Sequence, residues 1–336
     1  MNLPLKTFQQ FFGKKPLDIF DSFSKNAVHA ASIGQVHKAT LGDKVFAVKI
    51  QYPGIRESIG SDIALVKPIA VRMFNLQGTS DEYFQEVEEK LTEETDYKLE
   101  ISQSMKVIED CEKIDNLLFP KYYPEYSSDK IITMDWMNGI HLSEFCSSNA
   151  SQEQRNKVGQ TLWNFYMYQI HQLKKFHADP HPGNFLVDEN DNLIAIDFGC
   201  MKEIPNDFYV PYFEVSTKES LNDMDYFTKK LYELEILKSS DTPRELDFFT
   251  NLFHDLLSVF TQPIQAVVFD FAQPEFQTQI AVLSEKFSSD KTLRKMNGNR
   301  GSKHFIYVNR TFFGLYSLMA EIKAKVIVND FEKYLN

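Results

Sequence analysis

The chain has 336 residues, of which 43% are hydrophobic, 14% aromatic and 25% charged. This composition is enough for one two-lobed protein or two modest domains, and it excludes a disordered chain. The formal net charge is −11 and no Lys/Arg-rich block occurs, so nucleic acid is not expected as a partner. Neither a signal peptide nor a run of 18 apolar residues occurs, so we expect no membrane-spanning helix and a cytoplasmic location.

The first fifty residues predict helical turns followed by a β-hairpin. Residues 3–13 predict a helix that ends at Gly13, and residues 27–50 predict two strands joined at Gly42-Asp43. The first strand opens with small residues, which let backbone N–H groups approach phosphate closely, although a plain hairpin turn has the same composition. The candidate nucleotide-binding residues of this loop are Ala30, Ala31, Ser32, Ile33, Gly34, Gln35 and Val36.

The second strand of the hairpin carries a lysine among apolar residues. Side chains alternate along a strand, so Ala47 and Lys49 share one face. Phe46, Val48 and Ile50 face the opposite way. A strand lysine usually lies in solvent, but here the small Ala47 beside it leaves room for a ligand. This is the arrangement that a lysine needs to reach the phosphates of ATP.

Helical patterns follow the hairpin. Residues 57–76 predict a helix that is broken or kinked near Pro68, and residues 81–110 predict a longer, acidic helix. In that second helix Asp96 and Glu100 are four residues apart, which would place them on one face. A buried lysine needs a carboxylate partner. Glu94 and Glu100 are both candidates to pair with Lys49, and their spacing alone does not choose between them.

A hinge between two lobes is predicted in the middle of the chain. Residues 130–134 predict a strand, and the Gly-containing connector 135–139 leads into a mostly helical half. We therefore place an N-lobe at 1–137 and a C-lobe at 138–336. The backbone of the connector is suited to bind an adenine edge, although Trp136 serves equally well as simple packing. The candidate nucleotide-binding residues here are Met134, Asp135, Trp136 and Met137.

The candidate catalytic residues follow an amphipathic helix predicted at 151–176. The loop HADPHPGN (177–184) contains Asp179 and Asn184, and a predicted hairpin then delivers Asp197 in IDFG. Phosphoryl transfer from ATP needs one carboxylate for the proton of the nucleophile, and oxygen ligands for Mg²⁺. Asp179 fits the first role, and Asn184 with Asp197 fits the second. Taken singly, each of these segments is also typical of an ordinary turn.

The remainder of the chain predicts helices with breaks at prolines. Helical periodicity runs from residue 205 onward, and the predicted interruptions lie near Pro211, Pro243, Pro263 and Pro274 and at the loop 298–301. The three cysteines are far apart and form no CxxC pair, so neither a disulfide nor a zinc site is expected.

Six motifs together resemble one known family. They are AASIGQVH (30–37), FAVK (46–49), QYPG (51–54), EETDY (93–97), HADPHPGN (177–184) and IDFG (196–199). In this order they resemble the UbiB/AarF/ADCK (ABC-one) family of atypical protein-kinase-like proteins. The resemblance implies an α+β, protein-kinase-like two-lobed fold. Its small N-lobe would hold an antiparallel sheet plus extra helices, its larger C-lobe would be mostly helical, and Mg-ATP would bind in the cleft.

The resemblance also implies roles for individual residues. Lys49 would be the nucleotide lysine and Asp179 the catalytic aspartate, with Asn184 and Asp197 as ligands of Mg²⁺. Glu94 and Asp96 match the ExD element of the family, and Glu100 is the expected partner of Lys49.

The chain also departs from the family and from ordinary protein kinases. The KxGQ element of the family does not occur, so we expect either truncation relative to the natural protein or different regulation. Ala178 replaces the arginine of the HRD motif of protein kinases, and no APE motif follows IDFG. We therefore do not expect control by activation-loop phosphorylation.

The function implied by the resemblance is ATPase or phosphotransferase activity that supports isoprenoid-quinone biosynthesis or lipid handling. Lipid or quinone-pathway proteins would be the partners, with membrane contact only at the periphery. Two alternatives stay open. One is a nucleotide-binding pseudokinase scaffold without phosphoryl transfer, which the alanine-rich loop favours. The other is a small-molecule kinase of the aminoglycoside-phosphotransferase type, which carries a loop similar to HADPHPGN.

Overall fold

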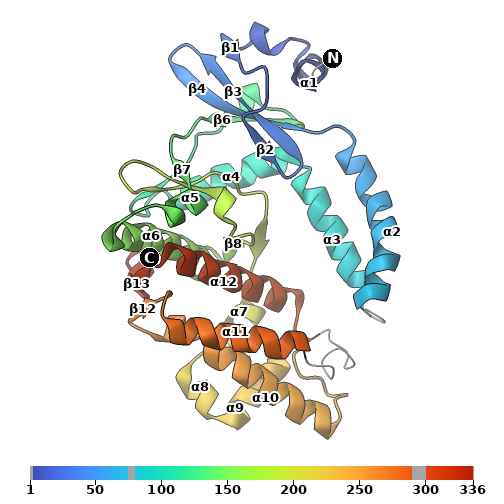
Figure 1. Ribbon diagram of the computed structural model, residues 1–336. Coiled ribbons are helices and arrows are strands. Elements are labelled where there is room, and N and C mark those ends of the chain that lie inside the picture. Colours follow the sequence, from blue (N-terminus) through green and yellow to red (C-terminus); the bar gives the residue numbers. More distant parts are fainter. Residues whose placement is uncertain (1–2, 75–79, 290–299, 336) are drawn as a thin grey trace. The chain divides into compact units, whose positions relative to one another are not determined.

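The computed structural model describes residues 3–74, 80–289 and 300–335, and the chain divides by contact into two compact units (Figure 1). The N-terminal unit consists of Met1–Glu112, Leu118–Gly139 and Ile194–Cys200. The C-terminal unit consists of Lys113–Leu117, Ile140–Leu193 and Met201–Asn336. These units differ from the predicted lobes, 1–137 and 138–336, in the three short segments 113–117, 138–139 and 194–200, and the lobe boundary itself stays a prediction.

In its described part, the N-terminal unit is built on a five-stranded antiparallel sheet. The strand order is β1-β3-β4-β6, and β2 also pairs with β3. The strands are β1 (Ser22–Phe23), β2 (His29–Ala31), β3 (Gly34–Leu41), β4 (Lys44–Gln51) and β6 (Ile131–Asp135). Leu41 pairs with Lys44 across Gly42, whose φ of +57° suits glycine, so the hairpin predicted at this turn is confirmed. Strand β2 is an addition that the sequence pattern did not predict.

The two faces of β4 differ as the alternation predicts. Phe46, Val48 and Ile50 pack on one face against Phe8 of α1 (Leu3–Phe12) and against Phe20. Helix α1 ends where Gly13 takes a φ of +63°, as predicted. The other face of β4 is thereby left for Lys49.

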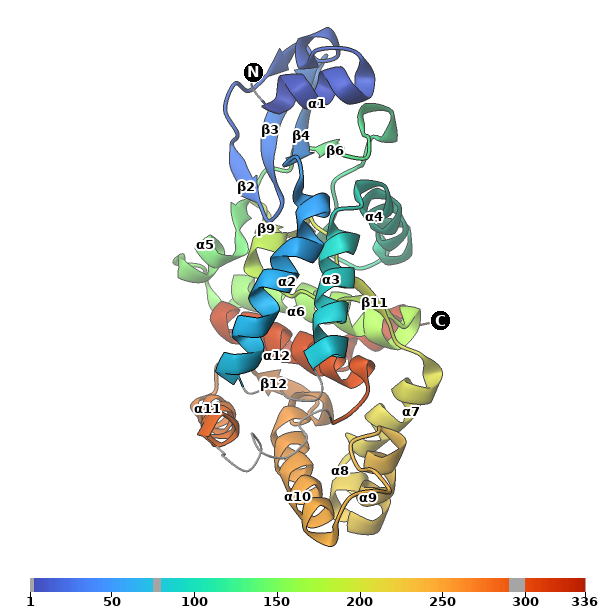
Figure 2. The same cartoon turned by 90° about the vertical axis from the view of Figure 1, so that its right-hand side faces the viewer.

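In the part of the chain that the structure describes, three α-helices come between β4 and β6. They are α2 (Ile55–Phe74), α3 (Ser80–Glu94) and α4 (Tyr97–Cys111), and α2 lies beside α3 (Figures 1 and 2). Of the break or kink predicted near Pro68, the break is wrong, because α2 continues through the proline, and the kink stays a prediction. A proline removes one hydrogen bond, and the neighbouring turns can carry the helix on.

The single helix predicted at 81–110 is also wrong. The chain leaves the helical path at Asp96, whose carboxylate accepts a hydrogen bond from the amide of Leu99 at 3.0 Å and so caps α4. Aspartate is among the residues that cap a helix best, which explains a new start inside a continuous acidic run. Asp96 therefore precedes α4 and does not share a helical face with Glu100.

The C-terminal unit is mostly helical. The breaks predicted at Pro243, Pro263 and Pro274 are confirmed, whereas Pro211 lies inside a helix. Residues 298 and 299 of the predicted loop 298–301 lie outside the described residues. The helices are α5 (Leu142–Ser147), α6 (Gln152–Tyr168), α7 (Asn206–Val215), α8 (Lys218–Asn222), α9 (Met224–Glu233), α10 (Pro243–Phe260), α11 (Pro274–Ser289) and α12 (Lys303–Ile322). Of the described helices, none has the length and apolar character needed to cross a membrane.

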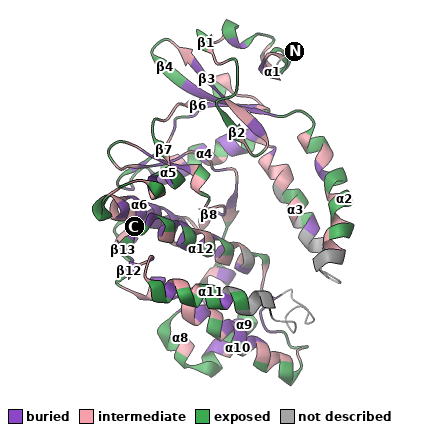
Figure 3. Cartoon of the chain, viewed as in Figure 1, coloured by how far each residue is buried: buried purple, intermediate pink, exposed green. Residues whose placement is uncertain are grey.

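Helix α6 is the buried centre of this unit, since all of residues 161–170 are buried (Figure 3). A π-helical turn, Gln169–Leu173, extends it, and Lys174 then ends it with a φ of +53°. The predicted end at residue 176 is wrong for that reason: residues 175–177 instead form β8 (Lys175–His177), which pairs with β11 (Met201–Glu203).

The remaining short strands border the connecting loops. They are β5 (Leu117–Leu118), β7 (Ile140–His141), β9 (Phe185–Val187), β10 (Leu193–Ala195), β12 (Val268–Asp270) and β13 (Lys325–Ile327). Strands β9 and β10 flank the polar turn 188–192, in which the Asp188 carboxylate accepts hydrogen bonds from the amides of Asn190 and Asn192. The strand–turn–strand pattern predicted before Asp197 is therefore confirmed.

Candidate functional site

Lys49 is the centre of a buried charged cluster in the N-terminal unit. Its strand, β4, lies between β3 and β6, and only 8% of its side chain is exposed. The ammonium donates a hydrogen bond to Glu100 Oε1 at 2.7 Å and another to Asp197 Oδ2 at 3.2 Å. The ring of Tyr97 lies 5.3 Å from the same ammonium. We refer to Lys49, Tyr97, Glu100 and Asp197 as the lysine cluster.

Helix α4 brings Glu100 to the lysine. The Asp96 cap starts the helix, and Glu100 lies in its first turn with 7% of its side chain exposed. Of the two acids that the sequence offers to Lys49, Glu100 is the one in hydrogen-bond contact. Glu94 is instead the last residue of α3 and acts on Glu100 through its charge. Removing one partner from a buried pair of this kind typically costs about 3–5 kcal/mol.

The cluster keeps its lysine charged. Burial works against the ammonium, but the carboxylates of Asp197 and Glu100 outweigh it and hold the pKa of Lys49 well above its usual range. Burial also raises the pKa of Glu100, and the charge of Asp197 adds to this, while the nearby ammonium opposes it. The arrangement is thus a fixed cation that two carboxylates aim from one side.

Asp197 is the more open of the two acids, with 36% of its side chain exposed. Its Oδ1 accepts a hydrogen bond from the amide of Gly199 at 2.9 Å, while its Oδ2 receives the one from Lys49. The next residue, Phe198, is buried and anchors the segment through its ring, 5.8 Å from that of Phe119. A carboxylate held in this way can still meet a ligand from its exposed side.

The segment 177–184, predicted as the catalytic loop and called by that name below, lies in the C-terminal unit. Asp179 is 47% exposed on its side chain, and Arg310 Nη2 of α12 lies 3.8 Å from its Oδ1. Asn184 Nδ2 donates to the backbone carbonyl of Asp179 at 3.0 Å. Because a carbonyl oxygen only accepts, the amide nitrogen must face the loop, so Asn184 Oδ1 is left to bind a cation. Gly314 of α12 has no room for a Cβ, which would lie 2.5 Å from Pro180 Cγ.

The predicted site residues therefore form two groups. Lys49, Glu100 and Asp197 meet within the N-terminal unit, and Asp179 and Asn184 meet within the C-terminal unit. Their catalytic roles stay predictions.

The small-residue loop forms the tip of the β2–β3 hairpin. Ala31 pairs with Gly34, and Ser32 and Ile33 make the turn. Gly34 is buried, and a Cβ on it would collide with the carbonyl oxygen of Ile50. The backbone is packed so closely at this position that only glycine fits without a shift. Nucleotide binding by this loop stays a prediction.

The start of the predicted connector 135–139 forms hydrogen bonds and ring contacts within the N-terminal unit. The amides of Asp135 and Trp136 donate to the carbonyls of Lys121 and Val45, both at 2.9 Å. The Trp136 ring stacks on His29 with the ring centres 5.8 Å apart. Packing by Trp136 is therefore present, and an adenine edge would have to use backbone groups other than these two amides.

Tyr97 is a member of the lysine cluster that the sequence reasoning did not single out. It lies in the quoted motif EETDY (93–97), yet aromatic residues next to acids are common, and no spacing rule points to one. Its burial beside Lys49 appears only once α4 is placed against β4.

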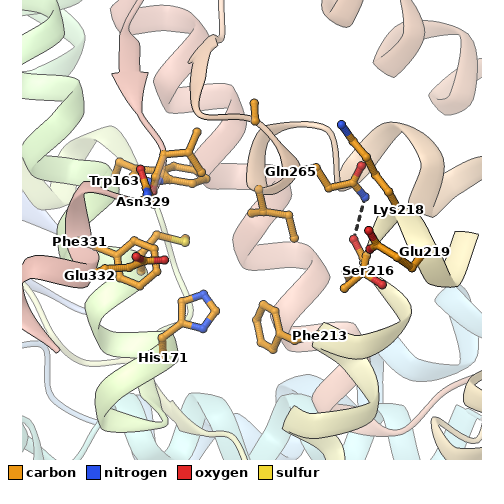
Figure 4. A pocket seen from close by; sticks show the side chains of 15 residues that line it. Trp163, His171, Phe213, Ser216, Lys218, Glu219, Gln265, Asn329, Phe331 and Glu332 are labelled. Atoms are coloured by element: carbon orange, nitrogen blue, oxygen red, sulfur yellow. Dashed lines mark hydrogen bonds between the residues drawn. The ribbon is translucent and has the colours of Figure 1, made fainter. Parts of the chain in front are cut away.

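A cavity of about 440 Å³ lies in the C-terminal unit, and none of the predicted site residues lines it. His171 projects into it between Phe331 and Phe213, with ring centres 5.0 and 4.6 Å away (Figure 4). His171 Nδ1 hydrogen-bonds with the Tyr209 hydroxyl at 2.7 Å. Burial, with the nearby charge of Lys174, lowers the pKa of His171 to about 4, so this imidazole is neutral at pH 7.

Comparison with solved structures supports the architecture. A structure described as the complex of Rv3197 with erythromycin, from Mycobacterium tuberculosis, matches with a TM-score of 0.73 and 24% identity, over 98% of this chain and 81% of that one. The likeness shows the fold. The predicted α+β, protein-kinase-like architecture, with its antiparallel sheet and its larger helical part, is confirmed.

The curated relatives are longer proteins, and the match covers only part of each of them. Protein ACTIVITY OF BC1 COMPLEX KINASE 8, chloroplastic, from Arabidopsis thaliana is 27% identical, over 76% of this chain and 35% of that protein. Atypical kinase COQ8, mitochondrial, from Saccharomyces cerevisiae is 31% identical, over 75% and 50%. The chain thus spans about a third to a half of these relatives. Their names place them in organelles, and the cytoplasmic location stays a prediction.

The sequence also matches the model of a protein family. The ABC1 atypical kinase-like domain aligns with residues 5–231, which include the lysine cluster and the catalytic loop. The six motifs indicate the same relationship, since UbiB/AarF/ADCK and ABC1 name one family. The chain belongs to the ABC1 atypical kinase-like family.

Proposed function

We propose that this protein binds a nucleoside triphosphate, ATP first, together with Mg²⁺, and transfers the terminal phosphoryl group to water or to an acceptor. The observation that carries the proposal is the buried ammonium of Lys49, held 2.7 Å from Glu100 and 3.2 Å from Asp197. A cation that two acids keep charged and aimed is suited to polyphosphate. Membership of a kinase-like family supports the same reading.

The oxygen donors suit magnesium. Asp197 offers carboxylate oxygens with an exposed side, and Asn184 offers its Oδ1, because its nitrogen is bonded to the loop. Mg²⁺ prefers hard oxygen ligands and is often bound by one or two protein groups plus phosphate and water. When bound, it would neutralise charge on the phosphates.

Asp179 is the candidate for orienting the nucleophile. Its carboxylate is half exposed and has Arg310 3.8 Å away, so one side is open to an incoming hydroxyl or water. An aspartate in this role accepts the proton of the nucleophile as the bond to phosphorus forms. The proposal requires that Asp179 and Lys49 serve the same nucleotide.

Equilibrium binding of Mg-ATP tests the nucleotide site. Asp197→Asn should lose most of its magnesium-dependent affinity, because a neutral amide replaces the anionic ligand. Asp191→Asn is the matched control: Asp191 has a φ of +58° in a turn, a conformation that asparagine also tolerates. Equal binding of Mg-ATP by Asp197→Asn and wild type would refute the metal assignment.

The wider role, support of isoprenoid-quinone biosynthesis or of lipid handling, rests on the family resemblance. Expression in a strain that lacks its own member of the family tests it, with quinone content as the measurement. Restored quinone supports the role, and unchanged quinone from a folded, nucleotide-binding protein counts against it. The same strain tests the scaffold alternative. If the protein acts as a scaffold without phosphoryl transfer, Asp179→Asn should restore quinone as well as wild type does.

A small-molecule kinase is the other candidate. The HADPHPGN loop favours it, and so does the likeness to a structure solved with erythromycin, a small molecule. A screen of small hydroxylated acceptors with γ-labelled ATP decides the matter. Labelled product that Asp179→Asn fails to make would favour this reading over the quinone-linked one.

A further inference from the structure

Tyr97 carries a buried hydroxyl that has no hydrogen-bond partner among the described residues. The residue opens α4 directly after the Asp96 cap and is fully buried. Its ring packs in an apolar cluster with Ile101, Tyr122 and Ile132. Leaving a buried hydroxyl unpaired costs free energy, so proteins rarely keep one without a use. A phenylalanine would fill the same space at no such cost.

The surroundings of the hydroxyl are those of the proposed nucleotide site. The Tyr97 ring lies 5.3 Å from the Lys49 ammonium. On another side is Gly34 of the small-residue hairpin tip, where an added Cβ would lie 3.1 Å from the hydroxyl oxygen. The Tyr97 side chain thus lies beside two elements assigned to phosphate, with its hydroxyl next to the loop backbone and its ring next to the lysine.

The charge state of Tyr97 suits a donor. Burial, together with the charges of Glu100 and Asp197, raises the pKa of its hydroxyl, and the charge of Lys49 only partly opposes this. The phenol therefore keeps its proton at neutral pH. Neither of the two neighbouring carboxylates accepts a hydrogen bond from this hydroxyl, so its acceptor must come from outside the described residues.

We propose that the Tyr97 hydroxyl donates a hydrogen bond to a phosphate oxygen of the bound nucleotide, beside Lys49. The inference rests on the proposed function and adds a contact to it. Phosphate oxygens are strong, anionic acceptors, which is the kind of partner that a buried protonated phenol lacks here. Gly34 covers the hydroxyl, so the phosphate reaches it when Gly34 and the Ser32–Ile33 turn move away from Tyr97 together. Tyr97 would then link closure of that hairpin to the start of the helix that holds Glu100.

A pair of conservative substitutions tests the proposal. Tyr97→Phe removes only the hydroxyl, and Tyr122→Phe is the matched control, because Tyr122 belongs to the same cluster and its buried hydroxyl likewise has no hydrogen-bond partner among the described residues. Titration with Mg-ATP should show Tyr97→Phe about tenfold weaker than wild type, the usual loss for one hydrogen bond to a charged group. Tyr122→Phe should bind as wild type does. Without nucleotide, Tyr97→Phe should melt at the same temperature as wild type or higher.

Two results would overturn the inference while leaving the proposed function standing. One is wild-type affinity for Mg-ATP in Tyr97→Phe. The other is a lower melting temperature of Tyr97→Phe without nucleotide, because that would mean the hydroxyl has a resident partner in the free protein. If wild-type protein itself fails to bind Mg-ATP, the proposed function fails first, and the two failures are thus distinguishable.

Discussion

The lysine cluster and the catalytic loop differ in how strongly the protein holds them. Lys49 and Glu100 are more than nine-tenths buried and joined by a 2.7 Å hydrogen bond. Asp179 is 47% exposed, and its ion pair with Arg310 is long, at 3.8 Å. A group that binds polyphosphate gains from being fixed in advance, whereas a group that handles the proton of the nucleophile must stay accessible. Substitutions that remove a charge from the cluster should therefore change stability and binding together, and substitutions in the loop should change turnover alone.

The largest effect is expected from Lys49→Met. The substitution leaves the buried carboxylate of Glu100 without its cation, which should lower the free energy of unfolding by about 3–5 kcal/mol. Urea unfolding measures this change. Lys98→Met is the matched control, because Lys98 pairs with Asp129 at 2.6 Å on the surface, with side chains 73% and 54% exposed. Its loss should be below about 1 kcal/mol.

The cost of Lys49→Met should also depend on pH. Burial already raises the pKa of Glu100, and removing the ammonium raises it further. An acid whose folded pKa is raised loses stability as pH rises from its unfolded pKa to its folded one, since only the unfolded chain ionises freely. Unfolding at pH 5 should thus show a smaller loss than at pH 8. An equal loss at both pH values would mean that water reaches Glu100 in the variant.

The C-terminal unit has a buried titratable group of its own, His171, away from the catalytic loop. Its folded pKa, lowered to about 4 by burial and by Lys174, is below the usual value of 6.5. Between pH 6.5 and 4 this histidine binds a proton in the unfolded chain but not in the folded one. The free energy of unfolding therefore falls as pH falls from 6.5 towards 4. The slope is at most about 1.4 kcal/mol per pH unit, or roughly 3 kcal/mol in all.

Chemical unfolding at several pH values checks this prediction. His171→Gln should unfold with a smaller dependence on pH between 6.5 and 4 than wild type, whatever its stability at pH 7. The same slope in both proteins would show that His171 takes up its proton without loss of the surrounding packing. That outcome would leave the lysine cluster as the more pH-sensitive of the two regions compared.

Substitutions of two glycines, Gly34 and Gly314, should affect the two regions in different ways. In Gly34→Ala the new Cβ would collide with the Ile50 carbonyl, a backbone atom in a sheet, so stability should fall by about 1–3 kcal/mol and nucleotide affinity with it. In Gly314→Ala the Cβ would lie 2.5 Å from Pro180, so the catalytic loop should shift and turnover should fall more than nucleotide affinity. Unfolding, Mg-ATP titration and turnover of both variants give the answer.

Gly60→Ala is the control for both glycines. Gly60 lies in α2, where a Cβ would meet only the end of the flexible Glu88 side chain, at 3.2 Å. Alanine favours a helix over glycine by about 1 kcal/mol, so this variant should be as stable as wild type or more so. If Gly34→Ala behaves in the same way, the backbone at the hairpin tip is looser than the structure indicates.

The parts of the site that local patterns determine could be predicted from the sequence. Alternation along a strand placed Lys49 opposite Phe46, Val48 and Ile50, and the structure has those faces. The choice between Glu94 and Glu100 was different. It depends on how α4 docks against β4, and Lys49 and Glu100 are 51 residues apart. No spacing rule covers such a contact, so residue patterns alone left both acids open.

The errors about helices have a similar cause. Asp96 interrupts an acidic run because its side chain caps a new helix, and Pro68 and Pro211 remain inside helices that simple rules would break there. At Asp96 the capping of a new helix outweighed the continuation of the acidic helix, and at the two prolines the continuation of the helix outweighed the tendency of proline to break it. Tyr97 was overlooked for a further reason: a buried hydroxyl becomes informative only when its neighbours are known.

The smallest change in stability is expected at Asp179, and it tests the comparison most directly. Asp179→Asn keeps the shape of a half-exposed side chain and removes one long ion pair, so the free energy of unfolding should change by less than about 0.5 kcal/mol. Mg-ATP should still bind, since the lysine cluster is intact, while phosphoryl transfer should fall by two orders of magnitude or more because the proton acceptor is gone. Urea unfolding, nucleotide titration and phosphate release on the same preparation separate the three quantities. A large loss of stability would mean that the loop is held as firmly as the cluster, and the contrast between a fixed binding group and an accessible catalytic one would then be wrong.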